Sequence, residues 1–313
     1  MATDVSEIKL PDVKLNICTP RDPVTVPVVE NWICTKASSP NFVRHIAFDI
    51  TGTNLEGNIK VGQAFGILPP GENEKGRPYK LRLYSLASPN DAQKNGRSIV
   101  STTVKRVIEE WVDEQRLYLG ICSNYLCNLR PGDEVKMTGP SGRRFLLPDN
   151  KDEFNYVFFA AGTGMAPFRG MVLELLEKGF DKEIILVFGC PYRTDILYYD
   201  FFRELEKTYD NCTFITRVSR EDRRPDGSKK YVQTSITDQS DTLHPVLRKS
   251  NSLIYICGLK GMETGIYRTL AQEGFEEYLN IDDEAKRKDP EMWDSHDLKR
   301  NIKPANRMFV EVY

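Results

Sequence analysis

Short apolar segments separated by turn residues fill the first half of the chain. Their pattern predicts strands at Val24–Val29, Val43–Ile50, Ala64–Leu68, Leu81–Leu86, Ile99–Val107 and Glu134–Thr138. Turn residues such as Asn95-Gly96 and Pro131-Gly132-Asp133 lie between these segments. Many short strands joined by turns are typical of a small antiparallel barrel.

The second half alternates between continuous apolar runs and helical patterns. Strands are expected at Tyr156–Ala160, Glu183–Phe188, Thr213–Val218 and Leu253–Cys257, and helices at Phe168–Lys178 and Tyr198–Tyr209. This alternation predicts a parallel doubly wound sheet. We expect the boundary near Pro148–Asp152, which gives a barrel domain at 1–150 and an α/β domain at 151–313. The charged stretch Asp282–Pro304 is expected to be a solvated loop or helix.

Composition excludes several classes of protein. Of the 313 residues, 40% are hydrophobic and 28% are charged, as in an ordinary globular protein, and the net charge of −2 argues against nucleic acid as a partner. No apolar run approaches the roughly 20 residues that span a bilayer, and the acidic start resembles neither a secretory signal nor a transit peptide. The seven scattered cysteines lack a CxxC pair, which favours reduced thiols and argues against structural zinc.

Two segments of the first half carry candidate binding chemistry. In the strand Arg82-Leu83-Tyr84-Ser85, Arg82 and Tyr84 share a face, so a guanidinium could meet a phosphate beside a ring that could cover a flat ligand. Gly120-Ile121-Cys122-Ser123-Asn124 allows a close backbone approach to an anion. If Ser123 caps a helix, its N–H groups would face a diphosphate. Alone, the two segments are also compatible with an ordinary barrel strand and a plain helix cap.

Two segments of the second half suit a nucleotide. Gly162-Thr163-Gly164 follows the first predicted strand and precedes a helix, which is where a doubly wound sheet presents a diphosphate site. Ser219 follows the third strand and begins a cationic segment that could bind a 2′-phosphate beside Tyr231. The cations of this segment are Arg220, Arg223, Arg224, Lys229 and Lys230. A tight turn and a solvated loop are the alternatives.

The last two candidates lie near the end of the chain. Cys257 ends the fourth predicted strand, and Gly258 after it would let a ligand approach the backbone; a buried, inert cysteine is the alternative. Phe309–Tyr313 alternates like a strand. An aromatic at a chain end that would ordinarily fray suggests a flat ligand that receives it, and a simple edge strand is the alternative.

Together these segments resemble the plant-type ferredoxin–NADP⁺ reductase family. The likeness extends from about Val24 to Tyr313, and its motifs follow the family order. They are RxYS (Arg82–Ser85), GICSN (Gly120–Asn124), GTGxAPFR (Gly162–Arg169), VSRE (Val218–Glu221), KKYVQ (Lys229–Gln233), CGLKGM (Cys257–Met262) and VEVY (Val310–Tyr313). Any one motif could occur by chance, whereas the ordered set is specific.

The resemblance implies two cofactor sites. FAD would bind the barrel through Arg82, Leu83, Tyr84, Ser85, Thr103, Lys105, Gly120, Ile121, Cys122 and Ser123. NADP(H) would bind the α/β domain, with Thr163 at the diphosphate, Gly258 and Leu259 beside the nucleotide, and Ser219, Arg220, Lys229 and Tyr231 at the 2′-phosphate. Tyr84 and Tyr313 would sandwich the flavin ring, and no metal is expected.

The implied activity is hydride exchange between NADP(H) and FAD, coupled to one-electron transfers with ferredoxin or flavodoxin. Ser85 would bond flavin N5, Cys257 would pack against the nicotinamide, and Glu311 would relay a proton or tune the one-electron state. Tyr313 would occupy the nicotinamide's place until displaced. The direction of electron flow stays open. We expect a monomer, in a bacterial cytoplasm or, for a processed form, in a plastid stroma.

An acidic partner would need a basic docking surface. The candidates are Lys75, Arg77, Lys80, Arg143 and Arg144. Rival interpretations are a reductase of another branch that feeds a haem protein, and a flavin- or nucleotide-binding scaffold without turnover.

The chain also departs from the family pattern. Ala161 stands where the family usually has Thr, and Thr103 stands in the place of a Cys. The usual adenine-stacking Tyr is absent, so Trp111 or Tyr118 is expected to substitute for it.

Overall fold

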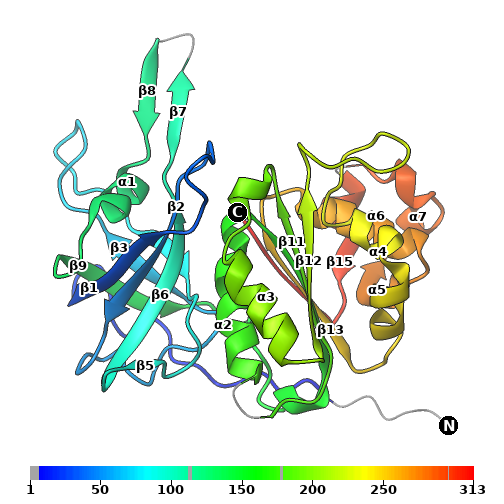
Figure 1. Ribbon diagram of the computed structural model, residues 1–313, viewed down its shortest axis with the longest axis horizontal. Helices are drawn as coiled ribbons and strands as arrows, with labels where there is room; N and C mark the ends of the chain where they lie inside the picture. Colours follow the sequence, from blue (N-terminus) through cyan, green and yellow to red (C-terminus); the bar gives the residue numbers. More distant parts are fainter. Residues whose placement is uncertain (1–6, 112–114, 177–178, 295) are drawn as a thin grey trace. The chain divides into compact units, whose positions relative to one another are not determined.

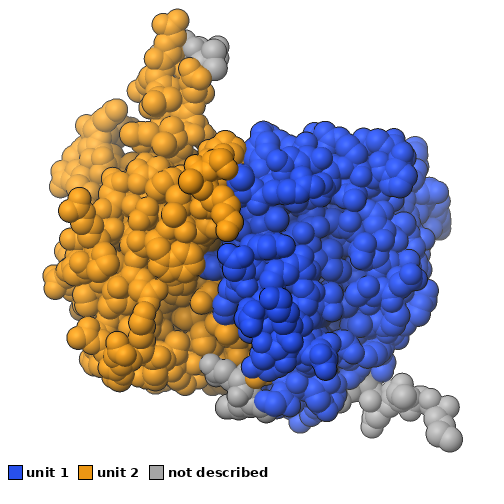
Figure 2. All heavy atoms as spheres, viewed as in Figure 1, with its two compact units in different colours: residues 1–9, 148–165, 179–313 blue, residues 10–147, 166–178 orange. Residues whose placement is uncertain are grey.

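The computed structural model describes residues 7–111, 115–176, 179–294 and 296–313. The chain forms two compact units, which Figure 2 distinguishes by colour. The barrel unit comprises residues 10–147 and 166–178, and the parallel-sheet unit comprises residues 1–9, 148–165 and 179–313.

Seven strands of the barrel unit form one antiparallel sheet in the order β4-β3-β9-β1-β2-β6-β5 (Figure 1). They are β1 (Val24–Ile33), β2 (Val43–Asp49), β3 (Ala64–Leu68), β4 (Arg82–Ser85), β5 (Gln93–Lys94), β6 (Arg97–Lys105) and β9 (Glu134–Ser141). The end of β4 returns to β6, because Thr102 Oγ1 donates to Ser85 O at 2.8 Å and Ala87 N–H donates to Ser101 O at 2.7 Å. The sheet therefore closes on itself, and the predicted antiparallel barrel is confirmed.

Alternation along the strands places apolar side chains inside this barrel. Val26 and Val28 of β1 and Ile46 and Phe48 of β2 are buried in its core. The Asn95-Gly96 turn joins β5 to β6 with positive φ at both residues, 53° and 73°, which is the backbone that a two-residue hairpin turn requires.

Two elements follow β6 before the sheet resumes at β9. A hairpin of β7 (Ile108–Trp111) and β8 (Arg116–Leu119) projects from the barrel, at the upper left of Figure 1, and leads into helix α1 (Ile121–Asn128). The sequence reading did not include this hairpin. Its strands mix charged and apolar residues, and all eight of its strand residues are exposed.

The parallel-sheet unit contains five parallel strands in the order β12-β11-β10-β13-β16. They are β10 (Asn155–Ala161), β11 (Ile184–Cys190), β12 (Cys212–Val218), β13 (Ser252–Gly258) and β16 (Met308–Val312). The chain starts at the central β10, adds strands on one side, and then reverses to β13 on the other. The predicted doubly wound sheet is confirmed, and its switch point lies between β10 and β13.

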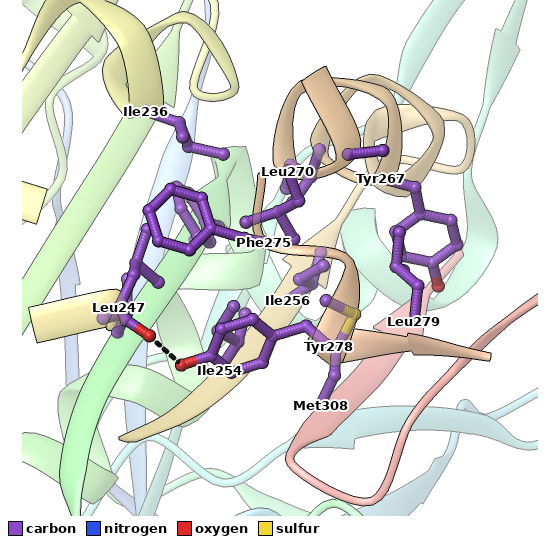
Figure 3. Packing of buried hydrophobic residues seen from close by; sticks show 14 of the residues in the cluster. Ile236, Leu247, Ile254, Ile256, Tyr267, Leu270, Phe275, Tyr278, Leu279 and Met308 are labelled. Atoms are coloured by element: carbon purple, nitrogen blue, oxygen red, sulfur yellow. Dashed lines mark hydrogen bonds between the residues drawn. The ribbon is translucent and has the colours of Figure 1, made fainter. Parts of the chain in front are cut away.

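Helices cover both faces of this sheet. Helix α3 (Tyr199–Thr208) lies on one face, and α4 (Thr234–Asp238), α5 (Ser240–Leu247) and α6 (Met262–Gln272) lie on the other (Figure 1). Alternate strand residues such as Ile254 and Ile256 pack against Ile236, Leu247 and Leu270 from these helices (Figure 3). Tyr278 closes the same core, and its hydroxyl donates to Leu247 O at 2.7 Å.

Helix α2 (Met165–Leu176) follows β10, but most of it belongs to the barrel unit. Arg169 donates to Ala87 O at 2.8 Å, and Glu174 accepts the Asn90 N–H at 3.0 Å. Lys178, the expected end of this helix, lies outside the described residues. The division into sequence domains 1–150 and 151–313 stays a prediction.

The prediction of a solvated loop or helix at Asp282–Pro304 holds only in part, because most of its charged residues are exposed but the segment also has a buried side. The segment contains α7 (Asp283–Lys286) and β15 (Ile302–Pro304), which pairs with β14 (Leu279–Ile281). Its Trp293 is buried and donates to Ala285 O at 3.1 Å. The buried carboxylate of Asp297 is neutralised within the segment, since Lys288 binds both of its oxygens at 2.8 and 3.0 Å.

Two further observations complete the fold. All seven cysteines lie in the described part of the chain, and each is a free thiol. Among the described residues, none of the helices has both the length and the apolar character that crossing a membrane would need.

Candidate functional site

Strand β4 places Arg82, Leu83, Tyr84 and Ser85 on the barrel. Arg82 is exposed, and Leu83 keeps 56% of its surface in solvent. Tyr84 is half-buried against the barrel core, and its hydroxyl contacts the Cys122 thiol of α1. Burial raises the pKa of Tyr84 and of Cys122, so both groups are uncharged. The structure thus brings Arg82–Ser85 beside the start of α1.

The N-terminus of α1 begins at Gly120. A Cβ at Gly120 would lie 2.7 Å from Ser123 Oγ and 2.8 Å from Val107 Cβ, so only glycine fits here. No side chain caps the helix, and its first turn carries no acidic residue. The backbone N–H groups of Ile121 and Cys122 are therefore available to an anion.

Ser123 does not cap this helix, so the condition set for it in the sequence is not met. Gly120 is the N-cap residue, and Ser123 lies inside the first turn. The Ser123 hydroxyl instead donates to Gly120 O at 3.1 Å and accepts the Val107 N–H at 3.2 Å. Its bonds join the helix start to the base of the hairpin, where Gly120 N–H also donates to Val107 O at 3.0 Å.

Strand β6 carries Thr103 and Lys105 toward the same hairpin base. Thr103 is buried opposite His45 of β2, whereas Lys105 is exposed at the end of the strand. Thr103 is therefore shielded from solvent, and Lys105 is the member of the pair that a ligand can reach.

One face of the hairpin is aromatic. The rings of Trp111 and Tyr118 stack with centroids 5.3 Å apart and planes 5° apart, and the Arg116 guanidinium lies 4.8 Å from the Trp111 ring centroid. Trp111 and Tyr118 are each 38% exposed. A flat platform of this kind suits stacking on a planar base.

The switch point of the parallel sheet brings two glycine-rich turns into contact. Gly162-Thr163-Gly164 follows β10, and Gly258-Leu259 comes at the end of β13. A Cβ on Gly164 would lie 2.2 Å from Cys257 O, and a Cβ on Gly258 would lie 2.9 Å from the Ala161 Cβ. The close approach leaves backbone at the crevice where doubly wound sheets bind nucleotides, and Leu259 projects from it, 64% exposed.

Tyr313 is anchored to both of these turns. Its N–H donates to Gly258 O at 3.0 Å, and its backbone oxygen accepts the Lys260 N–H at 3.0 Å. Its hydroxyl shares a hydrogen bond of 2.5 Å with Thr163 Oγ1. The backbone and the hydroxyl of Tyr313 are therefore held in place, while 57% of the residue's surface remains exposed.

Cys257 and Glu311 lie side by side in the ladder between β13 and β16. Burial, and secondarily the negative charge of Glu311, raises the pKa of the Cys257 thiol well above its usual range. Burial also raises the pKa of the Glu311 carboxyl. Cys257 is thus a neutral, fully buried thiol, which fits a packing role and not a nucleophile.

In the cationic segment after β12, some side chains bind other protein groups and others are exposed to a ligand. Arg224 binds Asp238 at 2.9 Å and Asp226 at 3.6 Å, and Arg223 donates to the backbone oxygens of Ser219 and Asp222 at 3.0 and 2.9 Å. Four predicted residues remain at the surface near the backbone bridge between Arg223 and Lys229. They are Ser219, which is half-buried, and Arg220, Lys229 and Tyr231, which are exposed.

Sequence reasoning missed Tyr192 in this group. Arg220 Nη1 donates to the Tyr192 hydroxyl at 2.8 Å, and the Arg220 guanidinium lies 5.3 Å from the Tyr192 ring centroid. Tyr192 lies two residues after the end of β11, so its place just past a strand that neighbours β12 was the available signal.

The predicted site residues thus form two groups. Arg82–Ser85, Thr103, Lys105 and Gly120–Ser123 belong to the barrel unit, and the remaining predicted residues belong to the parallel-sheet unit. Most of the second group lies at or just past the carboxyl ends of its strands, and Lys229 and Tyr231 lie in the loop after β12, an arrangement that suits a dinucleotide site.

Comparison with known proteins agrees with this geometry. The family model described as the oxidoreductase NAD-binding domain matches residues 158–268. The ferredoxin–NADP reductase of a Picosynechococcus strain is 36% identical over 96% of this chain and 72% of its own length. That of a Spirulina species is 35% identical over 96% of this chain and 99% of its own.

The chain belongs to the ferredoxin–NADP reductase family. A solved structure of the Plasmodium falciparum ferredoxin–NADP⁺ reductase with 2′P-AMP matches with a TM-score of 0.71, covering 96% of this chain and all of the other. Its identity is 22%, so this likeness concerns the fold. The resemblance read from the motifs is confirmed.

Proposed function

We propose that this chain is an FAD-dependent ferredoxin–NADP⁺ reductase. It is an oxidoreductase that exchanges a hydride between NADP(H) and FAD and single electrons with ferredoxin, or with flavodoxin as the alternative partner. The observation that carries the proposal is the anchoring of an aromatic residue, Tyr313, on both glycine-rich turns of the nucleotide crevice. A ring held there can compete with a nicotinamide for the same place.

The barrel residues fit FAD. The uncapped start of α1 offers N–H groups to a diphosphate, and the exposed Arg82 lies near enough to influence Cys122 in its first turn. The half-buried ring of Tyr84 suits one face of a flavin, and Lys105 and Ile121 are exposed beside the hairpin base and helix start. We propose Arg82–Ser85, Thr103, Lys105 and Gly120–Ser123 as the FAD site, with Thr103 acting through packing.

The aromatic face of the hairpin is our proposed adenine contact. Trp111 and Tyr118 stand where the family's usual Tyr is missing, and their exposed rings offer a planar surface. A base stacked there gains from both rings and from Arg116, which contacts Trp111.

The crevice residues fit NADP(H). Thr163 and the backbone of Gly258 and Leu259 would hold the diphosphate and the nicotinamide end. Ser219, Arg220 and Lys229 would bind the 2′-phosphate, and Tyr231 would stack on the adenine. When bound, FAD supplies the conversion between a two-electron hydride and single electrons.

We propose Ser85, Cys257, Glu311 and Tyr313 around the reacting atoms. The Ser85 hydroxyl would donate to flavin N5 or accept from it. The buried Cys257 thiol would pack against the nicotinamide and set its distance, and Glu311, whose pKa is raised by burial, can hold a proton nearer neutral pH than an exposed carboxyl does. Tyr313 would leave the ring face when the nicotinamide arrives.

The test is reduction of cytochrome c by NADPH with and without ferredoxin. A reductase of this family will show reduction that depends on ferredoxin and declines with rising salt, because the partner is acidic. Reduction that is independent of ferredoxin and flavodoxin would contradict the assignment.

The proposed docking residues for the acidic partner are all exposed: Lys75, Arg77, Lys80, Arg143 and Arg144. The curated relatives include cyanobacterial and chloroplastic proteins, which supports a bacterial cytoplasm or a plastid as the compartment.

A further inference from the structure

The segment after β11 lies along the segment after β12. Ser219 N–H donates to Cys190 O at 2.9 Å, and Arg220 N–H donates to Pro191 O at 3.0 Å, so the pairing of the two strands continues past their ends. Tyr192 and Arg193 come next and face the residues that follow Ser219. The family motifs assign no role to Arg193.

Arg193 binds the two carboxylates that directly follow Arg220. Glu221 Oε2 accepts the Arg193 backbone N–H at 2.6 Å and lies 3.4 Å from Arg193 Nη1. Asp222 accepts from Arg193 Nη2. One guanidinium therefore faces both negative charges of this loop.

The carboxylates of Glu221 and Asp222 lie next to the proposed 2′-phosphate site, where their negative charge would oppose phosphate binding. Glu221 and Asp222 are the two residues that follow Arg220, and their negative charges would repel a phosphate bound there even in a partly solvated loop. Arg223 and Arg224 cannot fully offset them, because Arg223 is turned to the backbone and Arg224 is bound to Asp238 and Asp226. Arg193 is the cation that faces both.

Stability does not account for this arrangement. Arg193 keeps 61% of its side-chain surface in solvent, and exposed pairs contribute little to folding. Electrostatic arrangement around a ligand site contributes to specificity instead.

We propose that Arg193 determines specificity for 2′-phosphorylated nucleotides by neutralising Glu221 and Asp222 beside Arg220. This inference rests on the proposed role of Arg220 and Lys229 in NADP(H) binding. Arg193 acts through the two carboxylates and needs no contact with the ligand. Tyr192 complements it by holding the Arg220 guanidinium in place.

The experiment measures Kd for 2′-phospho-AMP and for 5′-AMP by calorimetry on the FAD-loaded protein at low ionic strength. Arg193→Gln should weaken 2′-phospho-AMP about three- to tenfold and leave 5′-AMP unchanged, with a smaller effect at 0.15 M salt, where the screening length is about 8 Å. The triple variant Arg193→Gln/Glu221→Gln/Asp222→Asn should recover the wild-type affinity. Lys207→Gln, which removes a cation paired with Glu204 on α3, is the control and should change neither Kd.

Two results would overturn this inference without contradicting the proposed NADP(H) function. One is an unchanged Kd for 2′-phospho-AMP in Arg193→Gln. The other is a triple variant that stays as weak as the single one, because Arg193 would then contact the phosphate itself. A wild-type protein that does not prefer 2′-phospho-AMP over 5′-AMP would instead contradict the proposed NADP(H) function, and the inference with it.

Discussion

At the scale of single residues, Tyr313 shows what the sequence could and could not reveal. Its aromatic character at the end of an apolar strand indicated a ligand-facing role. Its hydrogen bonds to Thr163, Gly258 and Lys260 could not be predicted, since they join residues that are distant along the chain. The same holds for Tyr192 and Arg193, whose partners are 28 or 29 positions away.

Replacing Tyr313 by Ser should raise the affinity for NADP⁺ and slow turnover. A stacked aromatic contributes about 0.5–1.5 kcal/mol, so loss of its competition corresponds to a Kd lower by roughly two- to tenfold. Tyr313→Phe is the matched control: it keeps the ring, loses the bond to Thr163, and should bind NADP⁺ nearly as the wild type does. Titration of the flavin spectrum measures both, and an unchanged Kd in Tyr313→Ser would refute the competition.

Glu311 predicts a pH dependence of stability. Burial raises its pKa in the folded protein above the ordinary 4.5, so the folded state binds the proton more tightly than the unfolded state does. The contribution to stability is complete below the unfolded pKa and is lost as pH rises through the folded pKa. Glu311→Gln should therefore raise Tm relative to wild type at about pH 7–8 and not at about pH 4. An equal difference in Tm at both pH values would contradict this reading.

At the scale of elements, the sequence located most strands of both units, because alternation and turn residues are local signals. Val24 begins β1 and Ala64–Leu68 is β3, as predicted. The hairpin of β7 and β8 was missed because its apolar residues face solvent. The buried side of the segment from Asp282 was missed because Trp293 and the pair of Lys288 with Asp297 are surrounded in sequence by exposed charged residues.

The hairpin provides an element-level test of FAD binding. Trp111→Ala removes half of the aromatic platform and should weaken FAD, since stacking on a base contributes about 1–3 kcal/mol. FMN lacks the adenine, so its affinity for the same apoprotein should not change, which makes it the internal control. Fluorescence titration of apoprotein with each flavin measures this, and equal losses for FAD and FMN would place the effect elsewhere in the barrel.

The loop after β12 provides the corresponding test for NADP(H). Replacing Arg220 and Lys229 by Gln together would remove the two proposed charge-assisted contacts to the 2′-phosphate, each about 1.5–3 kcal/mol. The KM for NADPH should rise at least about tenfold, while that for NADH should change little. Steady-state kinetics with both nucleotides decides the matter, and the 2′-phosphate assignment fails if the two KM values rise together.

At the scale of the whole molecule, the change in hydrophobic pattern near Pro148 predicted that a barrel comes first along the chain and a doubly wound sheet follows it. The pattern could not show that most of α2 belongs to the barrel unit, because an amphipathic helix reveals that it has an apolar face and not what that face contacts. The contacts that hold α2 to the barrel include the hydrogen bonds from Arg169 to Ala87 and from Asn90 to Glu174. Both join residues more than 80 positions apart in the sequence.

Reduction of the bound flavin by NADPH is the most direct test of the central claim that this chain is an FAD-dependent reductase of NADP(H). The purified protein, loaded with FAD and kept free of oxygen, is mixed with one equivalent of NADPH or of NADH while its visible spectrum is followed. We predict that NADPH bleaches the flavin bands rapidly and that NADH does so far more slowly. A protein that does not retain FAD, or whose flavin is not reduced by NADPH, would contradict the account.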